Sequence, residues 1–385
     1  MTFENLALID PLLHALRTAG YTAPTPIQAQ SIPVLLAGSD LCGTAQTGTG
    51  KTAAFALPIL QRLAGTSHAH GRPQGRSSLP SLPSSGGIRA LILAPTRELA
   101  AQIGEAFIVY GCNLPDVRCG VVFGGMQLRA QSRALAQGID ILVATPGRLL
   151  DLVGRGIVRL DEVEVFVLDE ADRMLDMGFI NDVRTLVKRL PMRRQTAMFS
   201  ATMPTDIERL AGQILRNPVR VSVARASAVA PRVEQFVHFV EKPWKRQKLL
   251  EILADPAITS AIVFARTKKG ADRIAGSLNT AGIRTSLIHG DKEQAERIRA
   301  MAVFARGGTR VLVATDIAAR GIDIDGISHV INYDIPNIAE SYVHRIGRTA
   351  RAGASGVAIS LCASEELAWL RDIEKLTGVR VVPVA

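Results

Sequence analysis

Long hydrophobic runs, closely spaced cysteines and aromatic side chains are all scarce in this sequence of 385 residues. No stretch approaches the ~18 uncharged apolar residues of a membrane-spanning helix, and the N-terminus lacks the basic-then-apolar layout of a secretion signal. Four cysteines without C-x-x-C spacing indicate neither a zinc site nor a disulfide framework: Cys42, Cys112, Cys119 and Cys362. Aromatic residues make up 4% of the chain, too few for the stacking platforms of many single-strand binders. We therefore expect a cytoplasmic protein without membrane contact.

The net charge of +10 is the first positive signal, because a cationic protein attracts polyanions. The basic excess is spread over residues 1–217, 218–231 and 232–385 rather than collected in a tail. This distribution fits a polyanion-binding groove shared by two domains. A basic surface that serves only solubility is the alternative that charge alone leaves open.

Short runs rich in Val, Ile and Leu recur along the chain, and nearly all of them end in polar or small residues. Examples are "RALILAPT" (89–96), "VEVFVLDEAD" (163–172) and "RVLVATD" (310–316). Such runs are typical of strands buried on both faces, with crossover helices between them. The pattern predicts an α/β fold with two successive parallel sheets, each flanked by helices.

Composition also indicates where the two domains meet. Residues 216–235 lack a sustained helical period and contain Pro218 and Pro231, so we predict a linker at 218–231 between domains at 1–217 and 232–385. A segment rich in Gly, Ser and Pro, residues 65–87, predicts a loop inside the first domain. Ligands of parallel sheets gather at the carboxyl ends of the strands, where the polar residues of these runs fall.

Residues 45–52, "AQTGTGKT", nearly match the phosphate-binding pattern G-x-x-x-x-G-K-[ST], with Ala45 in place of the first glycine. Gly48 and Gly50 allow backbone N–H groups to approach phosphate oxygens, and a helix beginning at about Lys51 adds its positive end. Lys51 would hold the β- and γ-phosphates, and the hydroxyl of Thr52 would ligate Mg²⁺. Alanine suffices at position 45 unless the backbone there requires a positive φ.

A second motif, this one acidic, follows the apolar strand predicted at "VFVLDEAD". Asp169 has the place of a magnesium-orienting acid and Glu170 that of a carboxylate that activates water. Acidic residues that merely cap the first turn of a helix are the alternative. The order of the motifs, with the acids after a phosphate-binding loop, favours the catalytic interpretation.

Together with the phosphate-binding loop, "DEAD" at 169–172 resembles the DEAD-box ATP-dependent RNA helicases of superfamily 2, and further details resemble their bacterial RhlE-like branch. The resemblance implies two tandem RecA-like domains, and the family's phosphate loops regularly begin with Ala. "GYTAPTPIQ" (20–28) is similar to the family's adenine-reading Q motif. The implied ligands of ATP are Phe3, Tyr21, Gln28, Gln46, Thr47, Gly48, Thr49, Gly50, Lys51, Thr52 and Asp323. Among them Phe3 would stack on adenine, Gln28 would read it, and Asp323 would meet the ribose; Thr52 and Asp169 would hold Mg²⁺.

Further motifs resemble the family's RNA-contacting segments: "PTRELA" (95–100), "GG" (124–125), "TPGRLL" (145–150), "IVFARTK" (262–268) and "ATDIAARGIDI" (314–324). The RNA contacts that the resemblance implies are Thr96, Arg97, Gly125, Thr145, Gly147, Arg148, Arg266, Thr315 and Gly321. Hydroxyls, guanidinium groups and exposed backbone N–H groups suit phosphates and 2′-hydroxyls rather than base edges. We therefore expect RNA to be bound through its backbone, with little sequence specificity.

Two motifs are similar to the segments that connect ATP hydrolysis to unwinding: "SAT" (200–202) and "YVHRIGRTARAG" (342–353). The resemblance implies that Asp172, Ser200, Thr202 and His344 couple hydrolysis to unwinding, with His344 facing Asp172. It also implies that Arg345 and Arg348 complete a catalytic set with Lys51, Asp169 and Glu170, although two arginines at this spacing could equally form ion pairs on a helix surface. Ala350 stands where relatives more often have Gly, which casts slight doubt on the local backbone geometry.

The function that these motifs predict is an RNA-dependent ATPase, in which ATP and RNA close the two domains to unwind short duplexes or remodel RNA–protein complexes. Two alternatives stay open: a clamp that uses ATP to hold RNA with little strand separation, and a DNA helicase of the same superfamily. Closure can be completed within one chain, so we expect a monomer, and the sequence names no protein partner.

Overall fold

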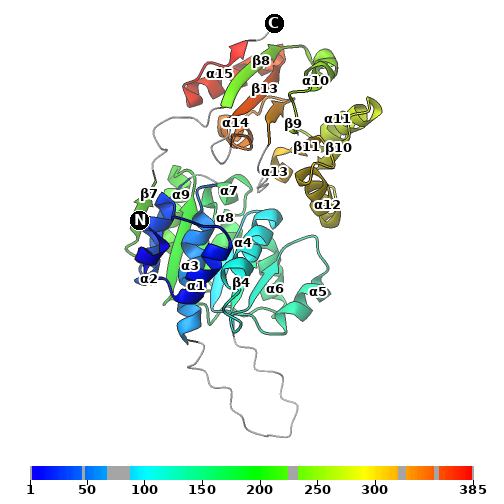
Figure 1. Cartoon of the computed structure of the whole chain (residues 1–385). Coiled ribbons are helices and arrows are strands. Elements are labelled where there is room, and N and C mark those ends of the chain that lie inside the picture. Colours follow the sequence, from blue (N-terminus) through cyan, green and yellow to red (C-terminus); the bar gives the residue numbers. More distant parts are fainter. Residues whose placement is uncertain are drawn as a thin grey trace. The chain divides into compact units, whose positions relative to one another are not determined.

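A computed structural model describes residues 2–45, 48–66, 87–223, 233–319, 327–350 and 355–383. The chain divides into two compact units, Met1–Ser227 and Ala228–Ala385 (Figure 1). Most of the predicted loop at 65–87 lies outside the described residues, as do four predicted site residues: Gln46, Thr47, Gly321 and Asp323. No helix among the described residues has the length and apolar character needed to span a bilayer.

The first unit is built on a seven-stranded sheet in the order β3-β4-β2-β5-β6-β1-β7, and every neighbouring pair is parallel. This confirms the parallel α/β sheet predicted from the short apolar runs. The strands are β1 (Leu41–Thr44), β2 (Ala90–Leu93), β3 (Cys119–Val122), β4 (Ile141–Ala144), β5 (Val165–Leu168), β6 (Gln195–Ser200) and β7 (Val219–Ser222).

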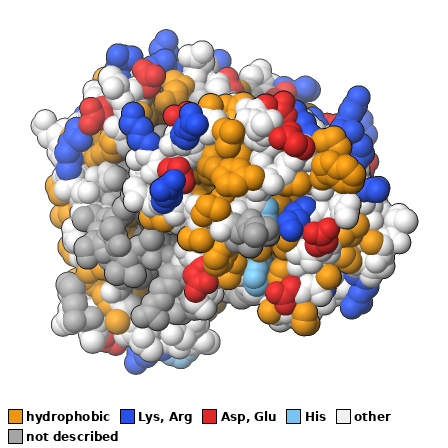
Figure 2. Space-filling view, turned by 90° about the horizontal axis from the view of Figure 1, so that it is seen from above, with side chains coloured by type: hydrophobic (Ala, Val, Ile, Leu, Met, Phe, Trp, Pro, Cys, Tyr) orange, Lys and Arg blue, Asp and Glu red, His pale blue; other side chains and the backbone are white. Residues whose placement is uncertain are grey.

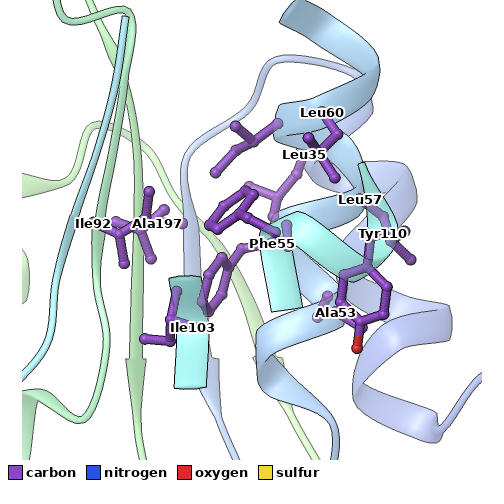
Figure 3. Packing of buried hydrophobic residues seen from close by; sticks show 14 of the residues in the cluster. Leu35, Ala53, Phe55, Leu57, Leu60, Ile92, Ile103, Tyr110 and Ala197 are labelled. Atoms are coloured by element: carbon purple, nitrogen blue, oxygen red, sulfur yellow. The ribbon is translucent and has the colours of Figure 1, made fainter. Parts of the chain in front are cut away.

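Helices cover both faces of this sheet, so alternate residues of one strand enter two separate cores. Ile92 packs in one core and its neighbours Leu91 and Leu93 in the other, and Figure 3 shows Phe55 of α3 and Ile103 of α4 packed on the face that carries Ile92. The helical elements are η1 (Phe3–Leu6), α1 (Asp10–Thr18), α2 (Pro26–Leu36), α3 (Lys51–Thr66), α4 (Arg97–Tyr110), α5 (Leu128–Leu135), α6 (Pro146–Gly154), α7 (Ala171–Asp176), α8 (Ile180–Val187) and α9 (Thr205–Ile214).

Strand β7 lies inside the segment that the sequence predicted as a linker. It pairs with β1, and its first residue, Val219, donates its backbone N–H to the carbonyl of Asp40 at 2.9 Å. The carboxylate of Asp40 also accepts the backbone N–H of Arg216 at 2.7 Å. The first unit therefore continues beyond residue 217, because these hydrogen bonds tie the chain to the sheet.

The second unit repeats the architecture with a sheet in the order β10-β11-β9-β12-β13-β8-β14, again parallel throughout. Its strands are β8 (Val233–Phe239), β9 (Ala261–Ala265), β10 (Thr285–Ile288), β11 (Val311–Thr315), β12 (His329–Asn332), β13 (Gly356–Cys362) and β14 (Val382–Pro383). Its helical elements are η2 (Lys242–Trp244), α10 (Lys245–Leu253), α11 (Lys268–Thr280), α12 (Gln294–Ala305), α13 (Asp316–Ala319), α14 (Ala339–Ile346), η3 (Ser364–Glu366) and α15 (Leu367–Thr377). On the face presented in Figure 2, basic side chains are interspersed with acidic ones.

Candidate functional site

The phosphate-binding loop connects β1 to α3, and α3 begins at Lys51 as the sequence predicted. Gly48 and Gly50 have φ of +84° and +88°, a region that only glycine adopts readily. Among the described residues the positive-φ positions do not include Ala45, so a methyl group is tolerated where the general pattern has glycine. The ammonium of Lys51, 6% exposed, donates to the carbonyl of Ala45 at 2.7 Å.

Gln28 connects the Q motif to this loop. Its Nε2 donates to the carbonyl of Gly50 at 3.1 Å, and its Oε1 accepts the backbone N–H of Thr25 at 2.9 Å. The second contact caps α2, which begins with a proline at its first position, a conformation that proline favours. A side chain at Gly50 would clash with the amide of Gln28. Gln28 is only 1% exposed, so its amide is held in place between α2 and the phosphate-binding loop.

Three aromatic rings lie beside the Q motif. Phe3 is 4% exposed and packs in the core, with its ring edge-on to Tyr21 at 6.4 Å between centroids. Tyr21 is 38% exposed, and its hydroxyl lies 2.8 Å from that of Tyr110. Burial, together with this hydrogen bond, raises the pKa of Tyr110. The exposed aromatic surface therefore belongs to Tyr21, while Phe3, predicted to stack on adenine, supports it from inside.

The acidic pair follows β5 at the carboxyl edge of the sheet. Asp169 is 2% exposed and Glu170 is 4% exposed. Glu170 has a left-handed backbone, with φ of 51° and ψ of 53°, and its N–H donates to Oδ1 of Asp169 at 2.9 Å. Burial raises the pKa of Asp169 to about 7, against the opposing charge of Lys51. A divalent cation bound beside Asp169 would stabilise the ionised carboxylate that burial disfavours.

Arg173 is a functional residue that the sequence reasoning missed. Its Nη1 donates to Oε2 of Glu170 inside the buried site, three residues along the same helical turn. The i, i+3 spacing was the only signal in the sequence that could have found this pair. The ion pair holds the Glu170 carboxylate in one orientation.

The three predicted coupling residues of the first unit, Asp172, Ser200 and Thr202, lie together in the structure. Oδ2 of Asp172 accepts the backbone N–H of Thr202 at 2.8 Å and its hydroxyl at 2.9 Å. The hydroxyl of Ser200 accepts the N–H of Asp172 at 3.1 Å and donates to the carbonyl of Thr202 at 2.7 Å. Asp172 therefore joins the end of β5 to the segment after β6. His344 lies in the second unit, and its contact with Asp172 stays a prediction.

The predicted RNA contacts of the first unit follow β2, β3 and β4. Thr96 caps α4 by accepting the N–H of Leu99 at 3.2 Å. The guanidinium of Arg97 lies so close to Gly125, whose φ is +85°, that any side chain at this glycine would collide with it. The positive φ favours glycine here, and any other residue would also displace the Arg97 guanidinium from this position.

The neighbouring loop is held by Arg148. Its Nη1 donates to the carbonyl of Met126 at 3.2 Å and to Oε1 of Gln131 at 2.7 Å. Gln131, 5% exposed, in turn donates to the carbonyl of Phe123 at 3.0 Å; the sequence analysis missed this residue. The other two predicted contacts start α6: Thr145 is its N-cap, and Gly147 is exposed, with open space around it.

The strand order separates two groups of residues along one edge of the sheet. The strands β3, β4 and β2 lie side by side and carry the predicted RNA contacts at their carboxyl ends, whereas β5, β6 and β1 carry the acidic pair, the "SAT" segment and the phosphate-binding loop. Thr49 and Thr52 are half-buried at the nucleotide end. Parallel strands bring their carboxyl ends to the same edge, which is why motifs far apart in sequence become neighbours.

Arg345, which the resemblance implies as a catalytic cation, is enclosed within the second unit. It is 2% exposed, and its Nε and Nη2 donate to the two carboxylate oxygens of Asp316 at 2.5 and 2.7 Å. Its Nη1 donates to Asn332 and to the carbonyl of Asp334. These contacts, all within the second unit, occupy the guanidinium and make Arg345 part of the scaffold that holds α14.

Two further predicted residues of this motif have little exposed surface. Arg348 is 5% exposed and His344 is half-buried. Ala350 has a φ of +56°, a left-handed conformation that costs roughly 1–2 kcal/mol for a residue with a Cβ. The exchange of glycine for alanine noted in the sequence therefore falls at a strained position.

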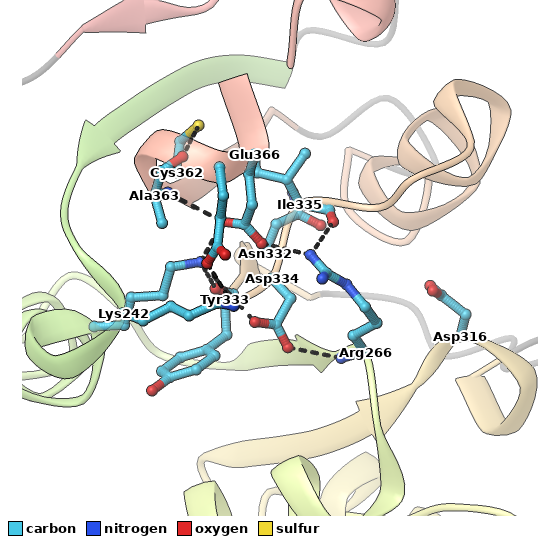
Figure 4. Close-up of polar contacts among 12 residues, drawn as sticks. Lys242, Arg266, Asp316, Asn332, Tyr333, Asp334, Ile335, Cys362, Ala363 and Glu366 are labelled. Atoms are coloured by element: carbon cyan, nitrogen blue, oxygen red, sulfur yellow. Dashed lines mark hydrogen bonds and ion pairs between the residues drawn. The ribbon is translucent and has the colours of Figure 1, made fainter. Parts of the chain in front are cut away.

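Arg266 and Thr315 lie at the carboxyl ends of β9 and β11, which are neighbouring strands. Thr315 is 7% exposed. Arg266 donates to Glu366 and to the carbonyl of Ile335 (Figure 4). The predicted RNA contacts of the second unit that the structure describes thus share one sheet edge, as those of the first unit do.

Comparisons with known proteins show the family. Residues 25–210 match the family model described as DEAD/DEAH box helicase, and residues 244–353 match that of the helicase conserved C-terminal domain. The chain belongs to the DEAD-box family of ATP-dependent RNA helicases. It is 42% identical over 376 residues to the DEAD-box ATP-dependent RNA helicase CshA of Geobacillus kaustophilus, covering 98% of this chain and 76% of the relative. The Bacillus subtilis CshA is 42% identical over 379 residues, with 98% and 72% covered.

Solved structures of DEAD-box proteins have the same fold. Saccharomyces cerevisiae Dbp5 bound to RNA and ADP BeF3 is similar with a TM-score of 0.83 and 31% identity, covering 100% of this chain and 95% of Dbp5. A DEAD box protein from Methanococcus jannaschii has a TM-score of 0.53 and 34% identity, with 100% and 99% covered. The two units of this DEAD-box protein are therefore RecA-like domains, and the predicted enzyme class, an ATP-dependent RNA helicase, is confirmed. The RhlE-like branch stays a prediction.

Proposed function

We propose that this DEAD-box protein is an RNA-dependent ATPase that unwinds short RNA duplexes or remodels RNA–protein complexes when ATP and RNA together close its two domains. The observation that supports this most is the strand order of the first sheet. The predicted RNA contacts follow β3, β4 and β2, the nucleotide motifs follow β5, β6 and β1, and the two groups meet where β2 pairs with β5. Asp172 follows β5 and binds the segment after β6, and β5 itself pairs directly with β2, the strand that Thr96 and Arg97 follow, so a change at the phosphates can reach the RNA contacts through one strand.

ATP would be held by the loop after β1. The ammonium of Lys51 binds the carbonyl of Ala45 within the loop, and exchanging that carbonyl for a phosphate oxygen costs the lysine little movement. Tyr21, the exposed ring beside the Q motif, would cover the base. Binding of the base would change the position of the phosphate-binding loop through Gln28, because the amide of Gln28 already donates to the carbonyl of Gly50.

Mg²⁺ fits the residues at this site. Asp169 is a buried carboxylate whose pKa is raised by burial, and Thr52 presents a hydroxyl at the first turn of α3. Asp169 and Thr52 would hold the ion, which would supply positive charge against the phosphate oxygens. Glu170 would orient the attacking water and accept its proton, with its carboxylate held by Arg173.

The cation supplied by the second domain would be Arg348. Arg345 is buried and makes a bidentate ion pair with Asp316, whose side chain is 29% exposed; leaving it would break this pair and strand the buried arginine charge. We therefore assign Arg345 a positioning role on α14 and Arg348 the contact with the γ-phosphate. Because ATP and RNA are both cytoplasmic, we assign the activity to the cytoplasm.

Steady-state ATP hydrolysis tests the proposal. It should be measured without nucleic acid, with single-stranded RNA and with single-stranded DNA of the same sequence, at low and moderate salt. We expect strong stimulation by RNA that falls with salt, abolished in Lys51→Ala and retained in Lys188→Ala, a change of an exposed lysine. Turnover that is independent of RNA, or stimulated by DNA alone, would contradict the proposal.

Strand separation needs its own assay, because a clamp would pass the first test. Release of a short labelled RNA duplex should be compared with RNA retention in the presence of a non-hydrolysable ATP analogue. An unwinding enzyme releases the strand with ATP, whereas a clamp retains RNA with the analogue and releases no strand.

A further inference from the structure

The second domain contains a cluster of charged side chains that the helicase motifs do not account for. Glu366 is 0% exposed and Lys245 is 1% exposed. The ammonium of Lys245 donates to Oε2 of Glu366 at 2.5 Å and to the carbonyl of Tyr333 at 2.8 Å. Buried ion pairs contribute little net stability compared with apolar packing, so this cluster calls for a reason other than stability.

The same carboxylate reaches Arg266 through its other oxygen. Nη2 of Arg266 donates to Oε1 of Glu366 at 2.5 Å and to the carbonyl of Ile335 at 3.0 Å. The centre of the guanidinium lies 4.4 Å from the ring centroid of Trp369 on α15. Arg266 is therefore held by an ion pair along one edge, drawn in Figure 4, and by the ring of Trp369 against its face.

The opposite edge of this guanidinium is left for a ligand. Of its five N–H donors, those on Nε and Nη1 make no hydrogen bond to any residue that the structure describes, and 34% of the side chain is exposed. Arg266 follows β9 directly, beside the end of β11. The Nη2 side of the guanidinium is thus bound within the domain, while its Nε and Nη1 donors remain available at the carboxyl ends of the strands.

We propose that Glu366 and Trp369 are positioning residues that hold Arg266 ready for a phosphate of the bound RNA, with Lys245 neutralising the second oxygen of Glu366. This inference rests on the proposed RNA-binding function and deepens it. A long side chain that is already ordered loses less conformational entropy when it binds, and a planar guanidinium held on two sides presents its free donors in a defined direction. Helix α15, outside the helicase motifs, thereby contributes to RNA affinity.

The first test is Trp369→Leu in the full chain, with affinity for a single-stranded RNA measured in the presence of an ATP analogue. We expect RNA binding to weaken about two- to five-fold, the loss that corresponds to a partly exposed cation–π contact. The affinity for ATP without RNA should not change. Trp369→Phe should retain RNA binding, and Trp244→Leu, at a 63% exposed tryptophan of the same domain, serves as the matched control.

The decisive measurement repeats Trp369→Leu in an Arg266→Ala background. If Trp369 acts through Arg266, the second change adds no further loss of RNA affinity; equal losses in both backgrounds, or no loss in either, overturn the inference. If Trp369→Leu lowers the unfolding temperature, Trp369→Met should be used instead, because methionine fills more of the space of tryptophan and has no aromatic face. Normal RNA binding by Arg266→Ala would defeat this inference alone, whereas wild-type ATPase activity indifferent to RNA would defeat the proposed function.

Discussion

Replacing the buried Asp169 by Asn should stabilise the ligand-free protein at alkaline pH while it abolishes ATP hydrolysis. Burial raises the pKa of Asp169 from 3.8 to about 7. Below pH 4 the carboxyl is neutral in both the folded and the unfolded protein, and burial then carries no charge penalty. As the pH rises towards 7 the unfolded chain ionises first, so folding becomes less favourable by about 1.4 kcal/mol per unit of pKa difference.

The upper bound of this effect is on the order of 4 kcal/mol above pH 7, because the pKa difference is about three units. Asn at this position could still accept the N–H of Glu170, which now binds Oδ1 at 2.9 Å. Its new amide N–H groups would lack assured acceptors, so the gain should be smaller than the bound. For a domain of this size about 1 kcal/mol corresponds to a shift of roughly 2–4 °C in Tm.

Thermal unfolding between pH 5 and pH 8, without nucleotide or Mg²⁺, is the assay. The Tm of Asp169→Asn minus that of the wild type should be smaller at pH 5, where about a third of the charge penalty is present, and should increase towards pH 8. Asp161→Asn is the control: Asp161 is exposed, its pKa is lowered by the hydrogen bond from Arg159, and it stays ionised throughout this range. A Tm difference for Asp169→Asn that does not depend on pH would refute the reasoning, because it would mean that the buried carboxylate is ionised at pH 5.

Three further predictions concern single side chains. Glu170→Gln should leave ATP binding intact while it suppresses phosphate release in single-turnover assays, and an unchanged turnover rate would remove Glu170 from the role of general base. Gly50→Ala should weaken ATP binding and lower the Tm, because the backbone has a φ of +88° and the new methyl meets the amide of Gln28; Gly212→Ala, in open space on α9, should do neither. Thr202→Val removes the hydroxyl bond to Asp172 at 2.9 Å, so duplex release should fall more than RNA-stimulated ATP hydrolysis does, and equal losses in the two assays would argue against a coupling role.

Much of the first domain's site could be predicted because its motifs lie at the ends of parallel strands. A short run of Val, Ile and Leu followed by polar residues indicates both a buried strand and the edge where the polar residues meet. On this basis the sequence predicted the sheet, the phosphate-binding loop and the acidic pair. Family resemblance predicted that Asp172, Ser200 and Thr202 are coupling residues, but only the structure shows the bond between Asp172 and Thr202, at 2.8 Å.

Other features could not be predicted, because burial depends on partners distant in sequence. Arg345 forms its ion pair with Asp316, 29 residues away, and Lys245 meets Glu366 across 121 residues. No local pattern distinguishes an arginine that faces a ligand from one that is enclosed in its own domain. For the same reason the sequence could not show that the ring of Phe3 packs in the core and that Tyr21 is the exposed aromatic residue beside the Q motif.

The sequence by itself determined the chemistry of this protein: a loop for phosphates, acids for a metal and for water, and hydroxyls and arginines for an RNA backbone. These are set by residue types at short spacing, which local conformation and strand polarity turn into sites. Only the tertiary structure decided which of the charged groups can contact a ligand and which form ion pairs with one another. The physical reason is that desolvation and ion pairing depend on the whole surroundings of a group, and these surroundings exist only once the chain has folded.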